Sequence, residues 1–165
     1  GMVIAAKDAA ALRDMNEAIR EDNLSKFYLC LVHGRVEREK ATLHGYLRKD
    51  SAKNMVEVRD KQFPGAKEII TKYRVLRENK EASLLEVELV TGRTHQIRAH
   101  MAHIGHPILG DLVYGRKKPE LGQDSQCLHA GALCFSHPRD GRPVLVFAPL
   151  PKYFTEVIEK LEKMG

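Results

Sequence analysis

The side chains best suited to chemistry in this 165-residue chain gather in one short segment, TGRTHQIRAH, at residues 91–100. Two arginines, two histidines, a glutamine and two threonines occupy these ten positions, where apolar residues begin to recur at helical spacing. The first turn of a helix offers unpaired backbone N–H groups and the positive end of the helix dipole, which favour an anion. Arg93 and His95 would lie at that end. The segment therefore predicts a site for a phosphate or a carboxylate.

Arg98 has a different expected environment, because it follows Ile97 and lies close to the apolar side of the same helix. A partly buried guanidinium needs an acidic partner or a bound anion, since an unpaired charge is costly to remove from water. Two interpretations stay open from the residues alone. Arg98 either forms a structural ion pair with a carboxylate of the core, or it holds an anion that belongs to a functional site.

The histidines raise the question of a metal site. His100, His103 and His106 recur at every third residue, and the first two could serve a small metal-dependent hydrolase. The segment, however, has no HExxH pattern, no neighbouring carboxylate in a ligand position and no cysteine pair. Histidines that organise loops through hydrogen bonds are the favoured interpretation, and we predict no metal.

Tyr28 lies within KFYLCLVH, residues 26–33, a run of β-forming residues that predicts a buried strand. A tyrosine in such a strand usually belongs to the core, where its hydroxyl finds an acceptor. Beside a basic cleft, the same ring can stack on a nucleobase that has been turned out of its helix. Composition does not separate these two interpretations.

Composition bounds the class of protein. A chain of this length with 43% hydrophobic residues is expected to form one domain with its own core. Lys and Arg outnumber Asp and Glu by 27 to 22, which is compatible with a polyanionic partner without requiring one. Cys30, Cys127 and Cys134 lack CxxC spacing and have apolar neighbours, which favours buried free thiols in a reducing cytoplasm. With no signal-peptide pattern and no membrane-spanning run, we expect a soluble cytoplasmic protein.

Three helices are predicted from apolar residues at helical spacing. Asp8 is expected to cap the first helix, Thr94 the second, and the third covers residues 151–164. Gly105 is expected to end the second helix. The expected apolar faces are Leu12, Met15 and Ile19 in the first helix, Ile97, Met101 and Ile104 in the second, and Phe154, Val157, Ile158 and Leu161 in the third.

Strands are predicted from β-forming runs and from alternation of apolar and polar positions. The predicted strands are residues 2–6, 26–33, 35–47, 68–76, 82–90, 128–135 and 144–150. The charged turn at 77–81 should join two of them into a hairpin. Several strands with three helices, not in strict alternation, predict an α+β fold with a mixed, mostly antiparallel sheet and flanking helices.

Four segments, in the same order along nearly the whole chain, resemble one family. VELVTGRTHQIRAHMAHIGHPILGDLVYG is similar to the signature of the RluA-type pseudouridine synthases, which isomerise uridine in ribosomal or transfer RNA. SKFYLCLVHG resembles the family's Lys-x-Tyr-x-Ala-x-Val strand, with Cys30 where alanine is usual. AKEIITKYRVL resembles its Ala-x-Thr-x-Tyr-x-Val strand, and QCLHAGALCFSHPRDG with FAPLP resembles its closing segment. The resemblance implies the family's catalytic-domain fold.

The resemblance also implies roles for individual residues. In this family an aspartate attacks the uridine, and the base detaches, rotates and rejoins through carbon, without a metal or an organic cofactor. Tyr28 matches the tyrosine that stacks on the base and helps to remove a proton. Arg98 matches the arginine that pairs with the catalytic aspartate. An opposite charge within a few ångströms lowers the pKa of a carboxylate, which suits a nucleophile. The residues expected to contact RNA are Lys26, Arg93, Thr94, His95 and Gln96.

The chain departs from the family pattern at the nucleophile. In the family, the aspartate lies in a His/Arg-Leu-Asp-x-x-Thr-x-Gly motif, and GMVIAAKDAAAL resembles the segment directly after that motif. Gly1 is either the motif's own glycine or an added residue. No Arg-Leu-Asp occurs in the chain, and Asp111 corresponds to a different family position, so we do not expect it to act as the nucleophile. The resemblance therefore implies that residues 1–165 are the C-terminal portion of a pseudouridine synthase catalytic domain.

Two functions are compatible with this sequence. The first is an RNA pseudouridine synthase whose target is large-subunit ribosomal RNA, with transfer RNA as the next choice. The second is a non-catalytic RNA-binding protein of the same fold. The oligomeric state stays open, although surfaces that missing strands would cover could pair with a second copy.

Overall fold

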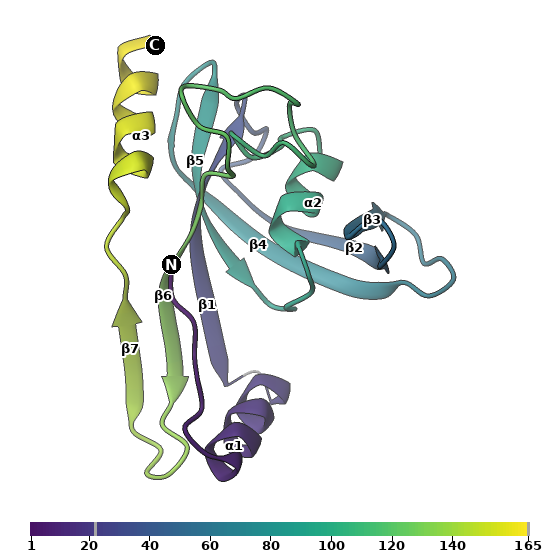
Figure 1. Ribbon diagram of the computed structural model, residues 1–165, viewed down its shortest axis with the longest axis vertical. Helices are drawn as coiled ribbons and strands as arrows, with labels where there is room; N and C mark the ends of the chain where they lie inside the picture. The colour runs from purple at the N-terminus through teal and green to yellow at the C-terminus, as the bar shows by residue number, and fades with distance from the viewer. Residues whose placement is uncertain (22, 165) are drawn as a thin grey trace.

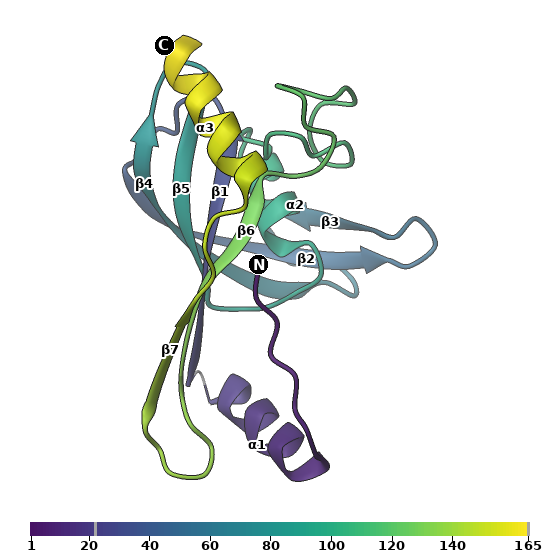
Figure 2. The ribbon, with the colours of Figure 1, turned by 60° about the vertical axis from the view of Figure 1, so that its left-hand side comes forward.

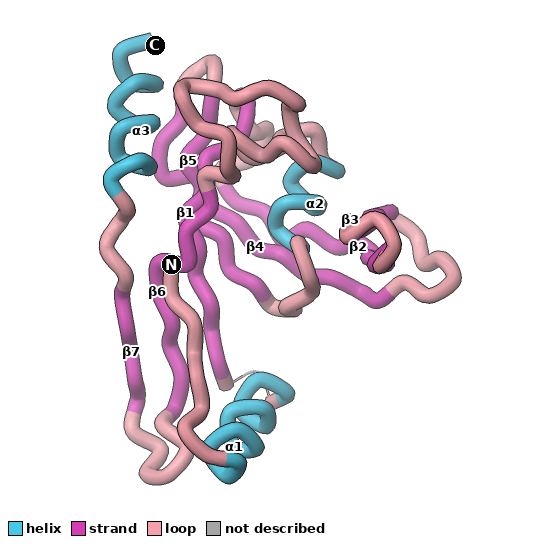
Figure 3. The backbone as a smooth tube through the Cα atoms, in the orientation of Figure 1, coloured by secondary structure: helices cyan, strands magenta, loops and turns pink. Residues whose placement is uncertain are grey.

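One sheet runs through the molecule and carries the other elements. The computed structural model describes residues 1–21 and 23–164 (Figure 1). Its elements are α1 (Ala9–Arg20), β1 (Leu24–His33), β2 (Lys40–Asp50), β3 (Met55–Arg59), β4 (Lys67–Glu78), β5 (Ala82–Leu89), α2 (Gln96–His103), β6 (Leu128–Ser136), β7 (Pro143–Phe147) and α3 (Lys152–Met164). The long connection between α2 and β6 is loop, as Figure 3 shows. The predicted α+β class is confirmed.

The sheet has seven strands in the order β3-β2-β4-β5-β1-β6-β7, and each pair of described neighbours is antiparallel. The predicted hairpin is present, because β4 pairs with β5 from Thr71↔Leu89 to Glu78↔Ser83. β1 lies inside the sheet between β5 and β6, with Tyr28 opposite Val87. The strand that carries Tyr28 therefore has a neighbour on each side.

Two of the helices complete the core as their apolar spacing predicted. Phe154 and Val157 of α3 are fully buried in the same apolar cluster as Ile97 and Met101 of α2. α2 contacts β2, β3 and β4. In Figures 1 and 2, α3 lies along one end of the sheet, with the C-terminus at its far end. Across the described helices, none has the length and apolarity needed to cross a bilayer.

The strand predicted at residues 2–6 does not form. These residues lie outside every described strand, and Val3 is 92% exposed. Gly1 packs on β6, where an added Cβ would lie 2.9 Å from the backbone nitrogen of Ala130. Both edges of β6 are already occupied by β1 and β7, so the segment cannot pair with the strand on which Gly1 packs. An apolar run that pairs with no neighbouring strand does not form a strand of its own.

The apolar stripe predicted for α1 is present in the helix but is mostly uncovered. Asp8 caps α1 as predicted, because its side chain accepts a hydrogen bond from the nitrogen of Ala11 at 2.7 Å. Met15 is 8% exposed, whereas Leu12 is 54% and Ile19 48% exposed. Figures 1 and 2 show α1 at one end of the sheet, next to the start of β1. The predicted stripe is therefore present on one face of α1, but only Met15 of the three side chains is buried.

Two of the three cysteines are buried, and the third is exposed. Cys30 and Cys127 are buried free thiols, as predicted, and burial raises their pKa to about 12 and about 11. Cys134 is exposed on β6, contrary to the prediction. Residues alternate between the two faces of a strand, and an apolar neighbourhood in the sequence does not say which face is covered.

Truncation of Met15 should therefore destabilise the protein more than truncation of Leu12. We expect Met15→Ala to lower the free energy of unfolding by about 2 kcal/mol, because it leaves a cavity. Leu12→Ala, at an exposed position, should change it by less than about 0.5 kcal/mol. Urea unfolding followed by circular dichroism gives both values. Equal losses would show that Leu12 is covered in solution.

His100 makes the stability depend on pH. Its Nδ1 lies 2.9 Å from Oγ1 of buried Thr71, and burial, followed by repulsion from His103, lowers the pKa of His100 to about 4. His44 also lowers this pKa through its charge, while a hydrogen bond from the imidazole to the backbone of His44 and the charge of Asp60 raise it. An unfolded histidine titrates near pH 6.5, so between these values the unfolded state binds the proton more strongly. Stability is therefore lost as the pH falls through this window.

We expect the free energy of unfolding to fall by about 2 kcal/mol from pH 7 to pH 5 because of His100. His100→Gln keeps a polar side chain beside Thr71 but cannot bind the proton. Urea unfolding at both pH values should show a smaller decrease for this variant than for the wild type. Equal decreases would assign the acid sensitivity to other groups.

Candidate functional site

Gln96 shapes the turn between β5 and α2. Its Oε1 accepts hydrogen bonds from the hydroxyl of Thr91 at 2.9 Å and from the backbone nitrogen of Arg93 at 3.0 Å. Its Nε2 donates to the carbonyl of Ile70 and to the hydroxyl of Thr71, both at 3.1 Å. Gln96 is 2% exposed, and these contacts use both of its polar atoms. The expected contact between Gln96 and RNA therefore gives way to a structural role.

The start of α2 differs from the prediction. The N-cap is His95, not Thr94, and its backbone is left-handed with φ of 55°. No side chain caps the helix there, and Thr94 is exposed. The network around Gln96 fixes the preceding turn, in which the nitrogen of Gln96 donates to the carbonyl of Arg93. Side-chain contacts with β4, which local sequence does not reveal, thus moved the cap by one residue.

His95 points to the neighbouring Tyr114. Its Nδ1 lies 3.0 Å from the hydroxyl of Tyr114, which in turn accepts a hydrogen bond from the nitrogen of Val56 at 2.9 Å. A hydroxyl that accepts from Val56 can donate to Nδ1, and this arrangement requires an unprotonated Nδ1. Burial, together with the charge of Arg98, lowers the pKa of His95. His95 is therefore a neutral group at pH 7 and adds no positive charge to the start of α2.

Arg98 binds a carboxylate within the chain. Its Nε donates to Oδ2 of Asp111 at 2.7 Å and its Nη2 to Oδ1 at 2.9 Å. The side chain of Arg98 is 13% exposed and that of Asp111 is fully buried. Burial alone would raise the pKa of Asp111, but hydrogen bonds from Arg98 and from the nitrogens of Tyr114 and Val113 outweigh it and lower the pKa. The same contact raises the pKa of Arg98.

The pairing with Asp111 agrees with the expectation that Arg98 would find an anion or a carboxylate. It corresponds to the interpretation in which that partner belongs to the core. The guanidinium also lies over the ring of Tyr114, with its central carbon 5.1 Å from the ring centroid. His95, Arg98, Asp111 and Tyr114 therefore form one connected cluster, which we call the arginine cluster.

Lys26 and Arg93, both expected to bind RNA, line one pocket of about 380 Å³. Lys26 comes from β1 and Arg93 from the turn after β5, and the Nζ of Lys26 lies 3.9 Å from where a Cβ of Gly92 would be. Arg20, from the last turn of α1, lines the same pocket and was not predicted. No local pattern marks Arg20, because it meets Lys26 and Arg93 only in the folded structure. Three cationic side chains on one pocket suit an anionic ligand such as a phosphate backbone.

Tyr28 is half-buried and lines a second cavity of about 290 Å³ that shares Lys26 with the first. The other walls come from the N-terminal segment, α1 and Leu133. The register between β1 and β6 shifts immediately after Phe27, with Gly131 as the extra residue. Such bulges redirect side chains and often lie beside active sites. Burial raises the pKa of Tyr28, so its hydroxyl is protonated at neutral pH.

The predicted site residues thus fall into two groups. Tyr28, Lys26 and Arg93 line two cavities that have Lys26 in common, while Arg98 belongs to the arginine cluster. The turn that Gln96 organises connects the groups, because Arg93 precedes it and Arg98 follows it in α2. The segment that was predicted as a single anion site therefore contributes to two neighbouring features.

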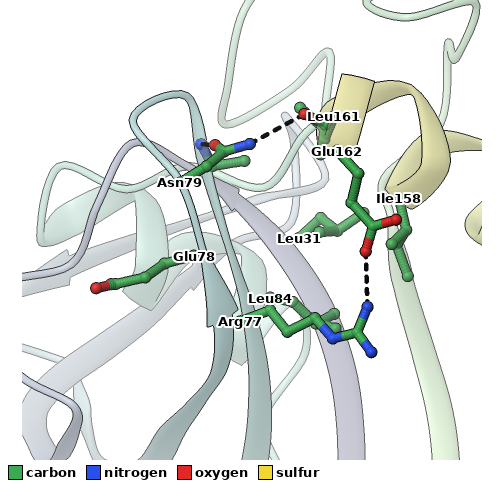
Figure 4. Close-up of a pocket in the computed structure, with 9 residues that line it drawn as sticks. Leu31, Arg77, Glu78, Asn79, Leu84, Ile158, Leu161 and Glu162 are labelled. Atoms are coloured by element: carbon green, nitrogen blue, oxygen red, sulfur yellow. Dashed lines mark hydrogen bonds and ion pairs between the residues drawn. The ribbon is translucent and has the colours of Figure 1, made fainter. Parts of the chain in front are cut away.

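A further pocket lies where α3 meets the sheet. Figure 4 shows a pocket of about 370 Å³ between α3 and the hairpin of β4 and β5. Arg77 and Glu162 pair across it at 2.6 Å, and Asn79 donates to the carbonyl of Leu161 at 3.1 Å. It contains none of the predicted site residues, and these contacts fasten α3 to the sheet.

The histidines of α2 lie in separate environments. His100 contacts Thr71 in the core, whereas Nε2 of His103 lies 2.7 Å from Asp60 at the surface. Within residues 1–21 and 23–164, no three or more His, Cys, Asp and Glu side chains are grouped as metal ligands. The histidines therefore act through hydrogen bonds and ion pairs.

Known proteins with similar sequences share one described activity. A family profile described as RNA pseudouridylate synthase matches residues 1–103. The chain is 36% identical over 167 residues to the uncharacterized RNA pseudouridine synthase YlyB of Bacillus subtilis, covering all of this chain and 53% of that protein. It is 32% identical over 168 residues to ribosomal large subunit pseudouridine synthase C of Vibrio cholerae, covering 99% of this chain and 52% of that protein. The chain thus spans about half the length of these curated relatives.

Solved structures with a similar fold agree with the sequence matches. Human RNA pseudouridylate synthase domain containing 1 superposes with a TM-score of 0.71 at 28% identity, over 88% of this chain and 62% of that one. The human protein numbered 4 in the same series gives a TM-score of 0.77 at 19% identity, over 94% of this chain and 69% of that one, which supports the fold alone. Because the family profile covers more than half of the sequence, this chain belongs to the RNA pseudouridylate synthase family.

Proposed function

We propose that residues 1–165 are the C-terminal portion of the catalytic domain of an RNA pseudouridine synthase whose nucleophilic aspartate lies outside them. The observation that carries this proposal is the family match combined with the absence of an Arg-Leu-Asp motif from the 165 residues. Its geometric support is the position of Gly1, which packs on Ala130, the residue opposite Tyr28. A residue joined to Gly1 would therefore start beside the tyrosine that the family places at the base.

In this proposal the chain supplies the aromatic ring for the base, the arginine partner of the nucleophile and the cations for the RNA backbone. Tyr28 enters the site as a neutral phenol, which can stack on the uracil and exchange a proton through its hydroxyl. Arg98 stabilises the ionised aspartate, since a nearby guanidinium favours the charged form of a carboxylate. Lys26 and Arg93, with Arg20 beside them, bind the RNA backbone. The reaction uses no metal or organic cofactor.

The proposed substrate is large-subunit ribosomal RNA in the cytoplasm, with transfer RNA as the second choice. The support is the name of the Vibrio cholerae relative, which specifies the ribosomal large subunit. Uridines in folded RNA are reached by unstacking, and a half-buried aromatic ring that lines a cavity beside cationic side chains suits such a base.

The alternative is an RNA-binding protein of the same fold without catalysis. It is favoured by one observation, namely that Arg98 already has a complete carboxylate partner in Asp111. An arginine that serves only the core needs no further aspartate. The two functions therefore differ in whether a second carboxylate has to reach Arg98.

We expect the 165-residue chain to form no pseudouridine, because the nucleophile is missing. The protein encoded by the complete open reading frame should form it if that frame encodes the Asp motif before Gly1. Both proteins are incubated with transcripts of large-subunit ribosomal RNA and of transfer RNA, and pseudouridine is mapped by carbodiimide modification and reverse transcription. Product from the short chain would show that the active site is misplaced. An upstream sequence without an acidic residue would favour the RNA-binding alternative.

RNA binding itself should depend on Lys26 and Arg93. Each of Lys26→Ala and Arg93→Ala should weaken binding and reduce the slope of log K against log salt by about one, as expected for the loss of one phosphate contact. Lys152→Ala, at an exposed lysine of α3, serves as the control and should leave the slope unchanged. Filter binding at several salt concentrations measures the slopes. Identical slopes for all variants would place the RNA elsewhere.

A further inference from the structure

We propose that Asp111 is a positioning residue, which holds one edge of the Arg98 guanidinium so that its other edge faces the nucleophile of the reaction. This inference rests on the proposed function. Asp111 does not itself attack the uridine or touch it. It acts through Arg98, which becomes the second partner of an aspartate that the 165 residues do not contain.

The contact between the two residues is one-sided. Asp111 binds the edge of the guanidinium formed by Nε and Nη2, at 2.7 and 2.9 Å. Two parallel hydrogen bonds fix the plane of the guanidinium as well as its position. The ring of Tyr114 lies against the same group, and the hydroxyl of Tyr114 is anchored to the backbone of Val56 in β3. Arg98 therefore has little freedom to turn.

The carboxylate is held as firmly as the guanidinium. Oδ1 of Asp111 accepts hydrogen bonds from the nitrogens of Val113 at 3.0 Å and Tyr114 at 3.1 Å, in addition to the bond from Arg98. The turn that allows this depends on the glycines on either side. Gly110 has φ of 76°, and a Cβ there would collide with the carbonyl oxygen of Ser125. A Cβ at Gly115 would lie 2.7 Å from the carbonyl oxygen of Asp111. Residues 110–115, GDLVYG, thus form a cradle around one carboxylate.

The opposite edge of Arg98 remains available. Nη1 has no hydrogen-bond partner in the part of the chain that the structure describes. No side-chain nitrogen or oxygen of the described residues is both buried and without a partner, so Nη1 reaches the surface. A guanidinium has five N–H groups, and Nη1 together with the second hydrogen of Nη2 forms a pair that fits another carboxylate. One arginine can therefore be fixed by Asp111 and still bind a nucleophilic aspartate.

A purely structural ion pair predicts different behaviour. Buried pairs of this kind often contribute little net stability, so burial alone does not explain the role of Asp111. If Asp111 only supports the fold, its replacement should reduce the amount of folded enzyme without a specific effect on turnover. If it positions Arg98, replacement should slow turnover in molecules that remain folded. The two possibilities are separated by kcat, KM and thermal stability measured together.

The experiment uses the full-length protein with Asp111→Asn, Arg98→Lys and the double variant. Arg98→Lys keeps the charge but removes the paired hydrogen bonds. We expect Asp111→Asn to lower kcat by about tenfold or more with KM within about twofold, measured where the variant is fully folded. The double variant should be no slower than Arg98→Lys alone, because Asp111 acts only through Arg98. Asp124→Asn, which removes an exposed carboxylate from the same loop, should leave kcat unchanged.

Three outcomes would overturn the inference. One is an unchanged kcat in folded Asp111→Asn, and another is an additive loss in the double variant, which would make the two residues independent. If Asp111→Asn does not fold, Asp111→Glu replaces it in the same cycle and is judged by the same criterion. The third outcome is a wild-type protein that forms no pseudouridine. That result removes the proposed function as well, whereas the first two leave it intact.

Discussion

A guanidinium that leaves water must be matched by a carboxylate, and this constraint governs the centre of the structure. Arg98 and Asp111 meet it through two hydrogen bonds of 2.7 and 2.9 Å. The pair joins α2 to the segment that follows it, and Tyr114 extends the connection to the backbone of β3. One ionic contact therefore sets the relative positions of a helix, a glycine-bounded turn and an edge strand of the sheet.

The neutral polar groups beside this pair follow the same rule. Gln96 and His100 are buried, and each has its hydrogen bonds supplied by β4 or by the turn before α2. Satisfied buried groups of this kind fix one arrangement, because any other would leave a donor or an acceptor unpaired. Lys26 and Arg93, in contrast, line a pocket that opens to solvent and stay available for an anion. The buried residues of the 91–100 segment therefore support the fold, whereas its exposed Arg93 can bind an anion.

The sheet brings these features into register with Tyr28. β1 lies between β5 and β6, and the bulge at Gly131 lies next to Ala130, the partner of Tyr28 on β6. α1 and the N-terminal segment meet the same region, although they leave Val3, Leu12 and Ile19 exposed. The helical spacing of apolar residues therefore predicted α1 but did not show which of its apolar side chains are buried. The chain belongs to the RNA pseudouridylate synthase family, and the proposed function assigns the aromatic ring, the cations and the arginine to that chemistry.

The sequence by itself determined the α+β class, the β4–β5 hairpin, the positions of the three helices within a few residues and the family, because these depend on local periodicity and on motifs in order. Only the tertiary structure decided that Asp111 is the partner of Arg98, that Gln96 is buried and that Arg20 joins Lys26 at one pocket. It also decided that residues 2–6 stay irregular and that His95 caps α2. The physical reason is that charge pairing, burial and strand edges are settled between segments far apart in the chain, and local sequence carries no record of which segments meet.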